Sequence, residues 1–190
     1  SDQTVAALIK RLNDPGPFVA VRAAESLGRF GPRAKSAVPA LTNLLADAER
    51  DVVARASAAT ALGKIGADAN DALATLLQTI KDRHAPYRDR AGVLIRPERD
   101  LIEINSLADA AFRLPVHRHH AAIAIARIAP NNQNVMDTLT AMLKDPSGFD
   151  LKTAGHALSW MGPNARAAIA YLVNELQSVD RARRVAGGGV

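Results

Sequence analysis

Apolar residues return along the chain at a regular interval, and each group of them has helical spacing. One leucine marks the same place in five segments: Leu8, Leu41, Leu76, Leu139 and Leu172. An apolar residue stands three positions before each of these leucines, and another stands four positions after it. Positions i, i+3 and i+7 share one face of a helix. The pattern therefore predicts five copies of one amphipathic helix, called the A helix below.

An aspartate follows the apolar face in four of the five copies. These residues are Asp14, Asp47, Asp82 and Asp145. A short carboxylate side chain favours the boundary of a helix, where it accepts hydrogen bonds from backbone N–H groups. We expect these aspartates to end the A helices and to accept from the first N–H groups of the next helix.

A second amphipathic segment, the B helix, completes four of the copies. Its last positions are Gly31, Gly66, Ala129 and Gly162. Small residues stand seven and three positions before this end, among them Gly155, Gly28 and Gly63. A glycine inside a helix costs about 1 kcal/mol relative to alanine, so its repeated use indicates a close approach of neighbouring helices. The terminal glycines are expected to have a positive φ, and proline follows directly at Pro32, Pro130 and Pro163.

Pairs of antiparallel helices that bury their apolar stripes only against the next pair form an α-α superhelix. The stretch VPALTNLLAD at 38–47 and the pattern D-x-x-x-R-x-x-A-A-x-x-L-G-x-I-G at 51–66 resemble the HEAT-like repeat family, in particular the short type found in phycobilin lyase subunits. The resemblance covers residues 4–82 and 117–178. It implies an all-α, HEAT-like solenoid of about four and a half helical hairpins with one helical insertion. The family's B-helix arginine is matched by Arg55 and Arg118, whereas Ala20 and Leu151 stand in its place in the other copies.

The repeat pattern predicts one domain over residues 1–180, followed by a flexible tail at 181–190. The repeats cover about 4–36, 37–71, 72–134 and 135–167, with a partial copy at 168–180. The chain starts almost directly on an A helix and ends on one without a full B helix. We therefore expect a piece of a longer repeat protein, and the alternative is a complete small domain that dimerises through its ends.

The third repeat is longer than the others because residues 83–116 lie between its A and B helices. Apolar spacing in this insertion predicts an extra helix over Glu98–Leu114, ended by Pro115. A basic stretch precedes that helix, with Arg88 and Arg90 beside Tyr87. Insertions in repeat proteins often carry binding residues, and the alternative is a solvated loop that packs over the edge of the solenoid.

His117 and His120 are candidate metal ligands, since they are three residues apart and imidazole is a common ligand of transition metals. No acidic residue lies at ligand spacing beside them. Histidines in the first turn of a helix are often exposed to solvent, and we expect this for both. The sequence thus predicts neither a metal site nor a cofactor.

A candidate binding surface runs along the B helices. Two positions before each B-helix end stand Arg29, Lys64, Arg127 and Trp160. Seven residues earlier, Arg22, Ser57, His120 and Thr153 are expected on the same outward face. The resemblance implies that B helices line the concave side of the solenoid. Tryptophan and arginine often dominate the energy of interfaces, so these basic residues and Trp160, with Tyr87, Arg88 and Arg90 of the insertion, are the predicted partner-binding residues. The alternative is a solvated face without a partner.

The composition of the chain limits the classes of function that it could have. The 190 residues include 24 basic and 19 acidic ones, for a net charge of +5, which suits an acidic protein partner or nucleic acid. The absence of cysteine excludes disulfides but leaves the redox compartment undetermined. No apolar run approaches the ~20 residues that span a bilayer, so we expect a soluble protein, and a cytoplasmic location is favoured. No catalytic motif stands out, which favours a binding protein over an enzyme. The sequence predicts a protein-interaction scaffold whose partner has an acidic surface; the alternatives are a phycobilin lyase-like subunit and binding of nucleic-acid phosphates.

Overall fold

The computed structural model describes residues 1–16, 18–82, 116–144, 148–166, 168–170 and 173, together with the backbone of 87–88 and 94–95. Contacts divide the chain into two units, Ser1–Ala129 and Pro130–Val190, which are treated separately below.

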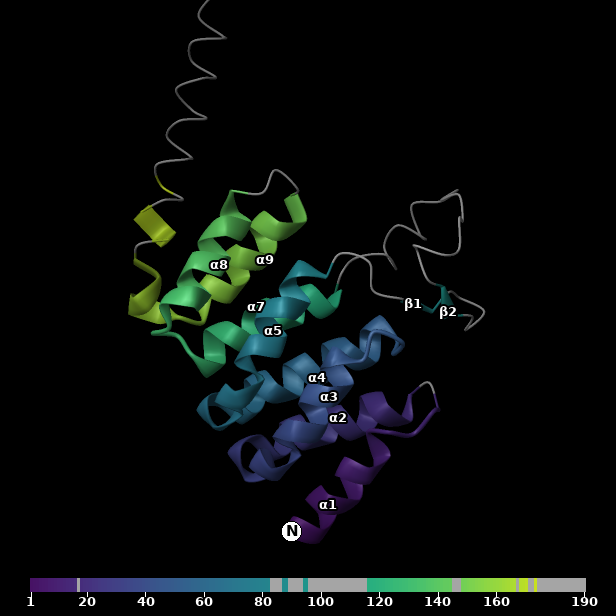
Figure 1. The fold of residues 1–190 in the computed structure, drawn as a ribbon. Helices are drawn as coiled ribbons and strands as arrows, with labels where there is room; N and C mark the ends of the chain where they lie inside the picture. Colours follow the sequence, from purple (N-terminus) through teal and green to yellow (C-terminus); the bar gives the residue numbers. More distant parts are fainter. Residues whose placement is uncertain are drawn as a thin grey trace, which may run out of the picture. The chain divides into compact units, whose positions relative to one another are not determined.

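The first unit is a stack of A and B helices (Figure 1). Its A helices are α1 (Asp2–Arg11), α3 (Val38–Ala46) and α5 (Leu73–Lys81), and its B helices are α2 (Val19–Phe30), α4 (Val52–Ile65) and α7 (Val116–Ile128). Each A helix packs against the B helix of its own pair, and neighbouring B helices also pack against each other. The predicted superhelix of helical hairpins is confirmed. The second unit contains the pair α8 (Gln133–Leu143) and α9 (Gly148–Ser159), followed by the 3-10 turn η3 (Gly162–Ala165).

The predicted apolar stripe forms the core of the A helices. No surface is exposed at Leu41, Leu76 or Leu139. In the first copy, the apolar positions before and after Leu8 are also buried, at Val5 in α1 and at Leu12 directly after it. Leu8 is half-buried, and among the described elements α1 packs mainly against α2 and η1. Leu172 lies outside the described residues. Burial of such stripes is the main stabilising contribution in the stack.

Two glycines allow the B helices to come close, as predicted. A Cβ atom on Gly28 would lie 3.1 Å from Ala61 Cα, and one on Gly63 would lie 3.0 Å from Ala124 Cα. Gly155 differs, because a Cβ atom there would meet nothing within 4 Å. The prediction of close packing is therefore right for α2–α4 and α4–α7 and wrong for Gly155.

Helices α2 and α4 end at glycines with positive φ, 56° at Gly31 and 78° at Gly66, whereas α7 is followed by Ala129. The accompanying ψ angles of −136° and −143° belong to a backbone region that only glycine adopts readily. After each glycine the chain turns through a 3-10 helix, η1 (Gly31–Ala37) or η2 (Gly66–Ala72), into the next A helix. We call this side of the stack the B-to-A edge and the opposite side, where A helices lead to B helices, the A-to-B edge.

Asp14 and Asp47 close local turns after their helices and do not cap the next helices, whereas Asp145 lies outside the described residues. Asp47 and Asp82 have extended backbone directly after α3 and α5. Asp14 and Asp47 accept from the N–H groups of Gly16 and Glu49, two residues later, inside the turn. The cap of α4 is instead Asp51, which accepts from Val53 N at 2.8 Å. Aspartate favours this local turn over a more distant helix start.

The insertion contains two short strands, β1 (Tyr87–Arg88) and β2 (Leu94–Ile95), paired antiparallel with Tyr87 opposite Ile95. Val116 belongs to α7 and not to the insertion. The helix predicted over 98–114 lies outside the described residues. Figure 1 shows the strands on the side of the A-to-B edge, where α5 leaves the stack and α7 returns to it.

Candidate functional site

Basic side chains recur at the C-terminal ends of the three B helices of the first unit. Arg29, Lys64 and Arg127 stand in the last turns of α2, α4 and α7. Arg29 and Lys64 are exposed and Arg127 is half-buried. With Arg22, which lies two turns earlier on α2 and is also exposed, they form what we call the basic ridge.

The packing of the B helices brings these charges close to one another. A Cβ atom on Gly28 would lie 3.3 Å from Lys64 Cδ, so the Lys64 stem crosses α2 next to Arg29. Axes of packed helices are about 8–10 Å apart, similar to the distance over which physiological salt screens charges. The potentials of successive ridge residues therefore add.

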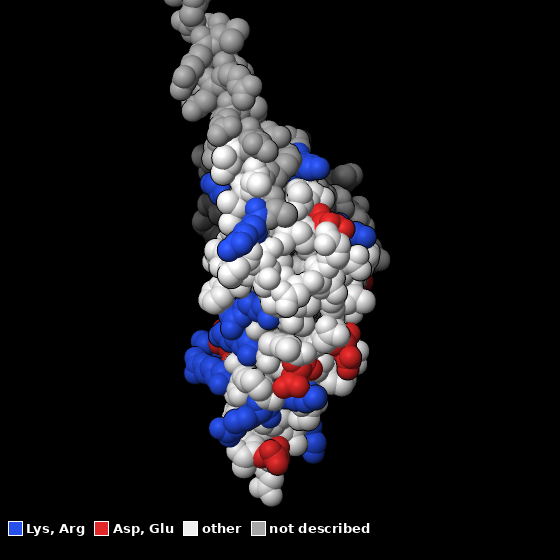
Figure 2. All heavy atoms as spheres, turned by 90° about the vertical axis from the view of Figure 1, so that its left-hand side faces the viewer, with Lys and Arg blue, Asp and Glu red and all other residues white. Residues whose placement is uncertain are grey.

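Few acidic groups oppose the basic ridge on its own helices. The sequences of α2, α4 and α7 contain one acidic residue, Glu25, which lies 3.0 Å from Arg22. Acidic residues occur instead in η2, where Asp68 pairs with Lys35 of η1 at 2.9 Å. This contact raises the pKa of Lys35 above its ordinary value, mainly through the hydrogen bond to Asp68. Figure 2, which faces the B-to-A edge, shows most basic side chains gathered toward one side of this face.

Other residues of the predicted surface have different surroundings. His120 is partly exposed, and its Nδ1 lies 3.0 Å from Thr60 Oγ1 on the neighbouring helix α4. Ser57 is also partly exposed. Thr153, in contrast, is buried at 1% exposure, so its predicted outward position is wrong. The α9 helix is turned so that Leu151 is exposed while Thr153 and Ala154 face inward.

Trp160 belongs to the second unit and follows α9. Its side chain is 52% exposed, as predicted for a residue outside the core stripe. Tyr87 and Arg88 form β1, and the structure describes their backbone alone. Arg90 lies outside the described residues. The binding roles predicted for these four residues stay predictions.

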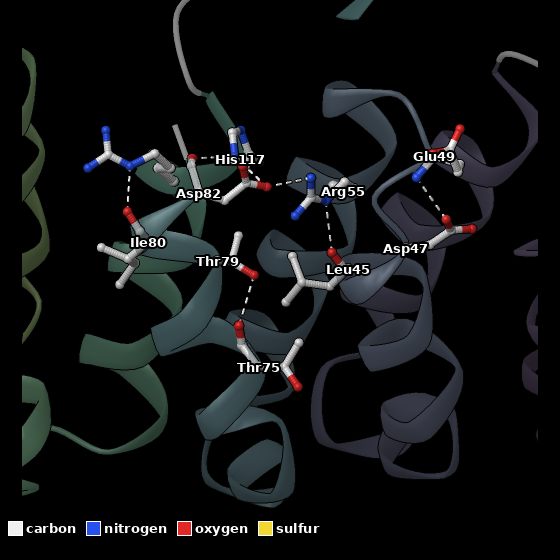
Figure 3. Close-up of polar contacts among 10 residues, drawn as sticks. Leu45, Asp47, Glu49, Arg55, Thr75, Thr79, Ile80, Asp82 and His117 are labelled. Carbon is white, nitrogen blue, oxygen red and sulfur yellow. Dashed lines mark hydrogen bonds and ion pairs between the residues drawn. The ribbon is translucent and has the colours of Figure 1, made fainter. Parts of the chain in front are cut away.

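What we call the buried polar cluster consists of the buried side chains of Arg55 and His117 and the half-buried Asp82, and lies at the A-to-B edge of the first unit (Figure 3). Arg55 Nε donates to Leu45 O at 2.9 Å, and its Nη1 lies 2.7 Å from Asp82 Oδ2. His117 Nε2 donates to Asp82 O at 3.1 Å and lies 3.6 Å from Asp82 Oδ2. The guanidinium thus satisfies a carbonyl at the end of α3 and reaches the residue that ends α5.

Arg118 repeats the first of these contacts one repeat later. It is buried, and its Nε donates to Ile80 O near the end of α5. Leu45 and Ile80 occupy equivalent positions in the repeat, four residues after Leu41 and Leu76. The two arginines that match the family pattern therefore have the same structural role. Each donates to a carbonyl at the end of an A helix that has no hydrogen-bond partner within that helix.

The histidines are placed differently from what the sequence led us to expect. His117 is 1% exposed, because α7 starts against the end of α5, and its expected exposure to solvent is wrong. Its Nε2 is engaged by Asp82, and His120 Nδ1 is close to Thr60. Within the described residues, no three His, Cys, Asp or Glu side chains gather in a way that could hold a metal ion.

The acidic partner of His117 could not be found locally in the sequence, since Asp82 is 35 residues away. A second contact was missed for the same reason. Arg50 donates to Asp14 O at 2.9 Å and to Asn13 O at 3.1 Å, across the turn after α1. One feature of the sequence could have indicated these contacts. An aspartate stands at the same repeat position in three copies, which places the turns that follow the A helices next to each other: Asp14, Asp47 and Asp82.

The helix pairs and their buried arginines define an α-helical repeat protein. A family model described as HEAT repeats matches residues 3–95, which supports the resemblance of the helix pairs in this part of the chain to HEAT-like repeats. HEAT repeats generally serve as scaffolds for protein–protein interaction. None of the curated proteins compared with the chain matches it significantly. No helix in the described part of the chain has the length and apolar character needed to cross a membrane.

Proposed function

We propose that this chain is a protein-interaction scaffold that binds a partner with an acidic surface through the basic ridge. The observation that carries the proposal is the charge of α2, α4 and α7, whose last turns hold the exposed Arg29 and Lys64 and the half-buried Arg127. Basic groups in a last helical turn also interact favourably with the helix dipole. The helix dipole explains why a basic residue is favoured at the end of any one helix. It does not explain why three neighbouring B helices carry a basic residue at the same repeat position.

The arrangement suits a protein partner for two physical reasons. The ridge is built on helices that are locked together by close packing at Gly28 and Gly63, so binding would order little of the backbone. Its charges lie on neighbouring helices, which allows an acidic surface to contact several of them at once. Complementary charge of this kind speeds association and selects among partners.

The test reverses the charge of the ridge and keeps a matched control. The ridge variant carries Arg29→Glu, Lys64→Glu and Arg127→Glu. The control carries Lys10→Glu, Lys152→Glu and Arg166→Glu, which change the net charge equally at exposed positions elsewhere. We expect the wild type and the control to capture the same acidic proteins from nuclease-treated lysate, and the ridge variant to capture at least about tenfold less of them, because each reversed contact turns attraction into repulsion.

Equal capture by the ridge variant and the control would contradict the proposal. Capture that disappears after nuclease treatment would instead favour the nucleic-acid alternative. That alternative also predicts that affinity for a DNA duplex falls steeply with salt, with a log–log slope of about −0.9 for each phosphate neutralised. The family match does not bear on the phycobilin lyase-like alternative, which is tested by the visible absorbance of the chain after mixing with bilin.

A further inference from the structure

A cavity of about 620 Å³ lies between the C-terminal end of α3 and one side of α5, from its first turn to its end, beside the buried polar cluster. Ala46 and Ala74 form parts of its two walls, with the polar side chains of Thr75 and Gln78 on the α5 side. Arg55 lines it as well. The volume falls within the range of about 300–1,000 Å³ that is typical of small-ligand sites. The cavity is built from A helices at the A-to-B edge and is separate from the basic ridge.

The Arg55 guanidinium has hydrogen-bonding capacity that the fold does not use. A guanidinium carries five N–H donors. Nε donates to Leu45 O, and Nη1 lies near Asp82 Oδ2 without the alignment of a hydrogen bond. Nη2 makes no hydrogen bond or ion pair with any residue that the structure describes. Figure 3 shows Nη2 pointing away from both contacts, toward the side of α5 on which Thr79 lies.

The guanidinium combines a buried donor without a hydrogen bond, Nη1, with a second donor that faces the cavity, Nη2. The Arg55 side chain is 5% exposed, so water reaches little of it. A buried donor without an acceptor loses the hydration that it had in the unfolded chain. Asp82 compensates part of the charge, but its carboxylate lies on one side of the guanidinium and leaves Nη2 toward the cavity.

We propose that the cavity binds a carboxylate carried on a short aliphatic stem, with the carboxylate oxygens accepting from Arg55. Planar guanidinium and carboxylate groups match each other in geometry, and charge-assisted hydrogen bonds between them are stronger than neutral ones. The lining charges are Arg55, Lys81 and Asp82, which sum to +1 and suit a monoanion. A dianionic phosphate would meet the repulsion of the Asp82 carboxylate. The methyl groups of Ala46 and Ala74 leave room for the stem and contact it.

The binding test uses alanine-methyl NMR with three probes. Butyrate represents a free acid, N-acetylglutamate α-amide represents an acidic side chain in a protein, and N-acetylglutamine α-amide is the uncharged control. Both carboxylates are expected to cause saturable shifts of the Ala46 and Ala74 methyl signals, and the glutamine probe none. Tighter binding of the glutamate probe identifies a protein side chain as the source, and tighter binding of butyrate identifies a free acid.

Two results would overturn the carboxylate site. One is an equal response to the glutamine probe. The other is the absence of saturable shifts at ~10 mM carboxylate, well above the ~1 mM dissociation constant expected for a weak site.

Variants separate the cavity from the basic ridge. Ala74→Leu fills the cavity without touching the guanidinium contacts, and Ala74 is exposed enough for the helix to keep its fold, which circular dichroism checks. We expect this variant to bind the carboxylates at least tenfold more weakly. Arg29→Gln, on the ridge, should leave the affinity within twofold. Undiminished binding by the Ala74→Leu variant would show that the carboxylates bind elsewhere.

Discussion

The two edges of the helix stack use charged residues in opposite ways. At the A-to-B edge, Arg55 and His117 are buried and link successive repeats through Leu45 O and Asp82. At the B-to-A edge, the corresponding link is an ion pair between Lys35 and Asp68 whose side chains are 69% and 41% exposed. Both contacts join neighbouring repeats, yet only the first is shielded from water. Charged side chains at the A-to-B edge are therefore used inside the stack, whereas those at the B-to-A edge stay accessible to partners.

The backbone explains the difference between the edges. An A helix ends with carbonyl groups that have no partner inside the helix, and the following aspartate turns the chain away. Arginine side chains from the B helices satisfy these carbonyls. Helices α2 and α4 end instead at a glycine with positive φ, and the 3-10 turn that follows each of them satisfies much of the backbone by itself. Side chains at that edge are therefore not required for the turn.

The largest effect is expected from removing the buried guanidinium. Arg55→Met should lower the free energy of unfolding by about 3–5 kcal/mol, because Asp82 and Leu45 O lose a buried partner. Urea denaturation followed by circular dichroism measures this. The same substitution at exposed Arg29 is the control and should change stability by less than about 0.5 kcal/mol. Similar losses in the two variants would show that the edges do not differ.

The packing between the edges gives the next effect. Gly63→Ala should destabilise the protein by about 1–3 kcal/mol, since the new Cβ atom would lie 3.0 Å from backbone Cα of Ala124, which cannot move without shifting α7. Gly155→Ala is the matched control, because nothing lies within 4 Å of its Cβ position. That substitution should stabilise α9 by up to about 1 kcal/mol. Thermal denaturation of both variants measures whether stability falls or rises in each. A fall in stability in both variants would contradict the close-packing role of Gly63.

The first turn of the A-to-B edge allows a smaller test. Ala20 stands where Arg55 and Arg118 stand in later repeats, and Arg50 from the following turn donates to Asn13 O and Asp14 O. Arg50→Ala should cost about 1 kcal/mol, as expected for partly exposed hydrogen bonds. Arg11→Ala removes a more exposed arginine whose contact to Asp14 is 3.4 Å long, and it should cost less. Urea denaturation that ranks Arg11 above Arg50 would refute the compensating role of Arg50.

Much of the fold could be predicted from the sequence because each repeat needs the same buried apolar face and the same small residues. Leu41, Leu76 and Leu139 share one face, and Gly28 and Gly63 mark the close contacts between B helices. Periodicity within a segment reports which face is buried. It could also identify Arg55 and Arg118 as equivalent.

Contacts between segments were harder to predict. The pairing of His117 with Asp82 depends on how α7 returns to the stack after the insertion, and no local pattern fixes that geometry. The burial of Thr153 depends on the rotation of α9 about its own axis. The cavity beside Arg55 arises because Ala46 and Ala74 are too small to fill the space between α3 and α5, which is a property of their distance apart.

The smallest effect concerns the exposed ion pair at the B-to-A edge. The pKa of Lys35 is raised above 10.5, first by the hydrogen bond to Asp68 and then by its charge, with a lesser contribution from Asp71. Because the folded-state pKa is raised, the stabilisation is complete below pH 10.5 and is lost as pH rises past the folded-state value. Asp68→Asn should return the pKa of Lys35 close to 10.5, whereas Asp71→Asn should lower it only slightly. NMR titration of the lysine side chain measures both shifts, and a larger effect of Asp71→Asn would mean that the contact across this edge does not join Lys35 to Asp68.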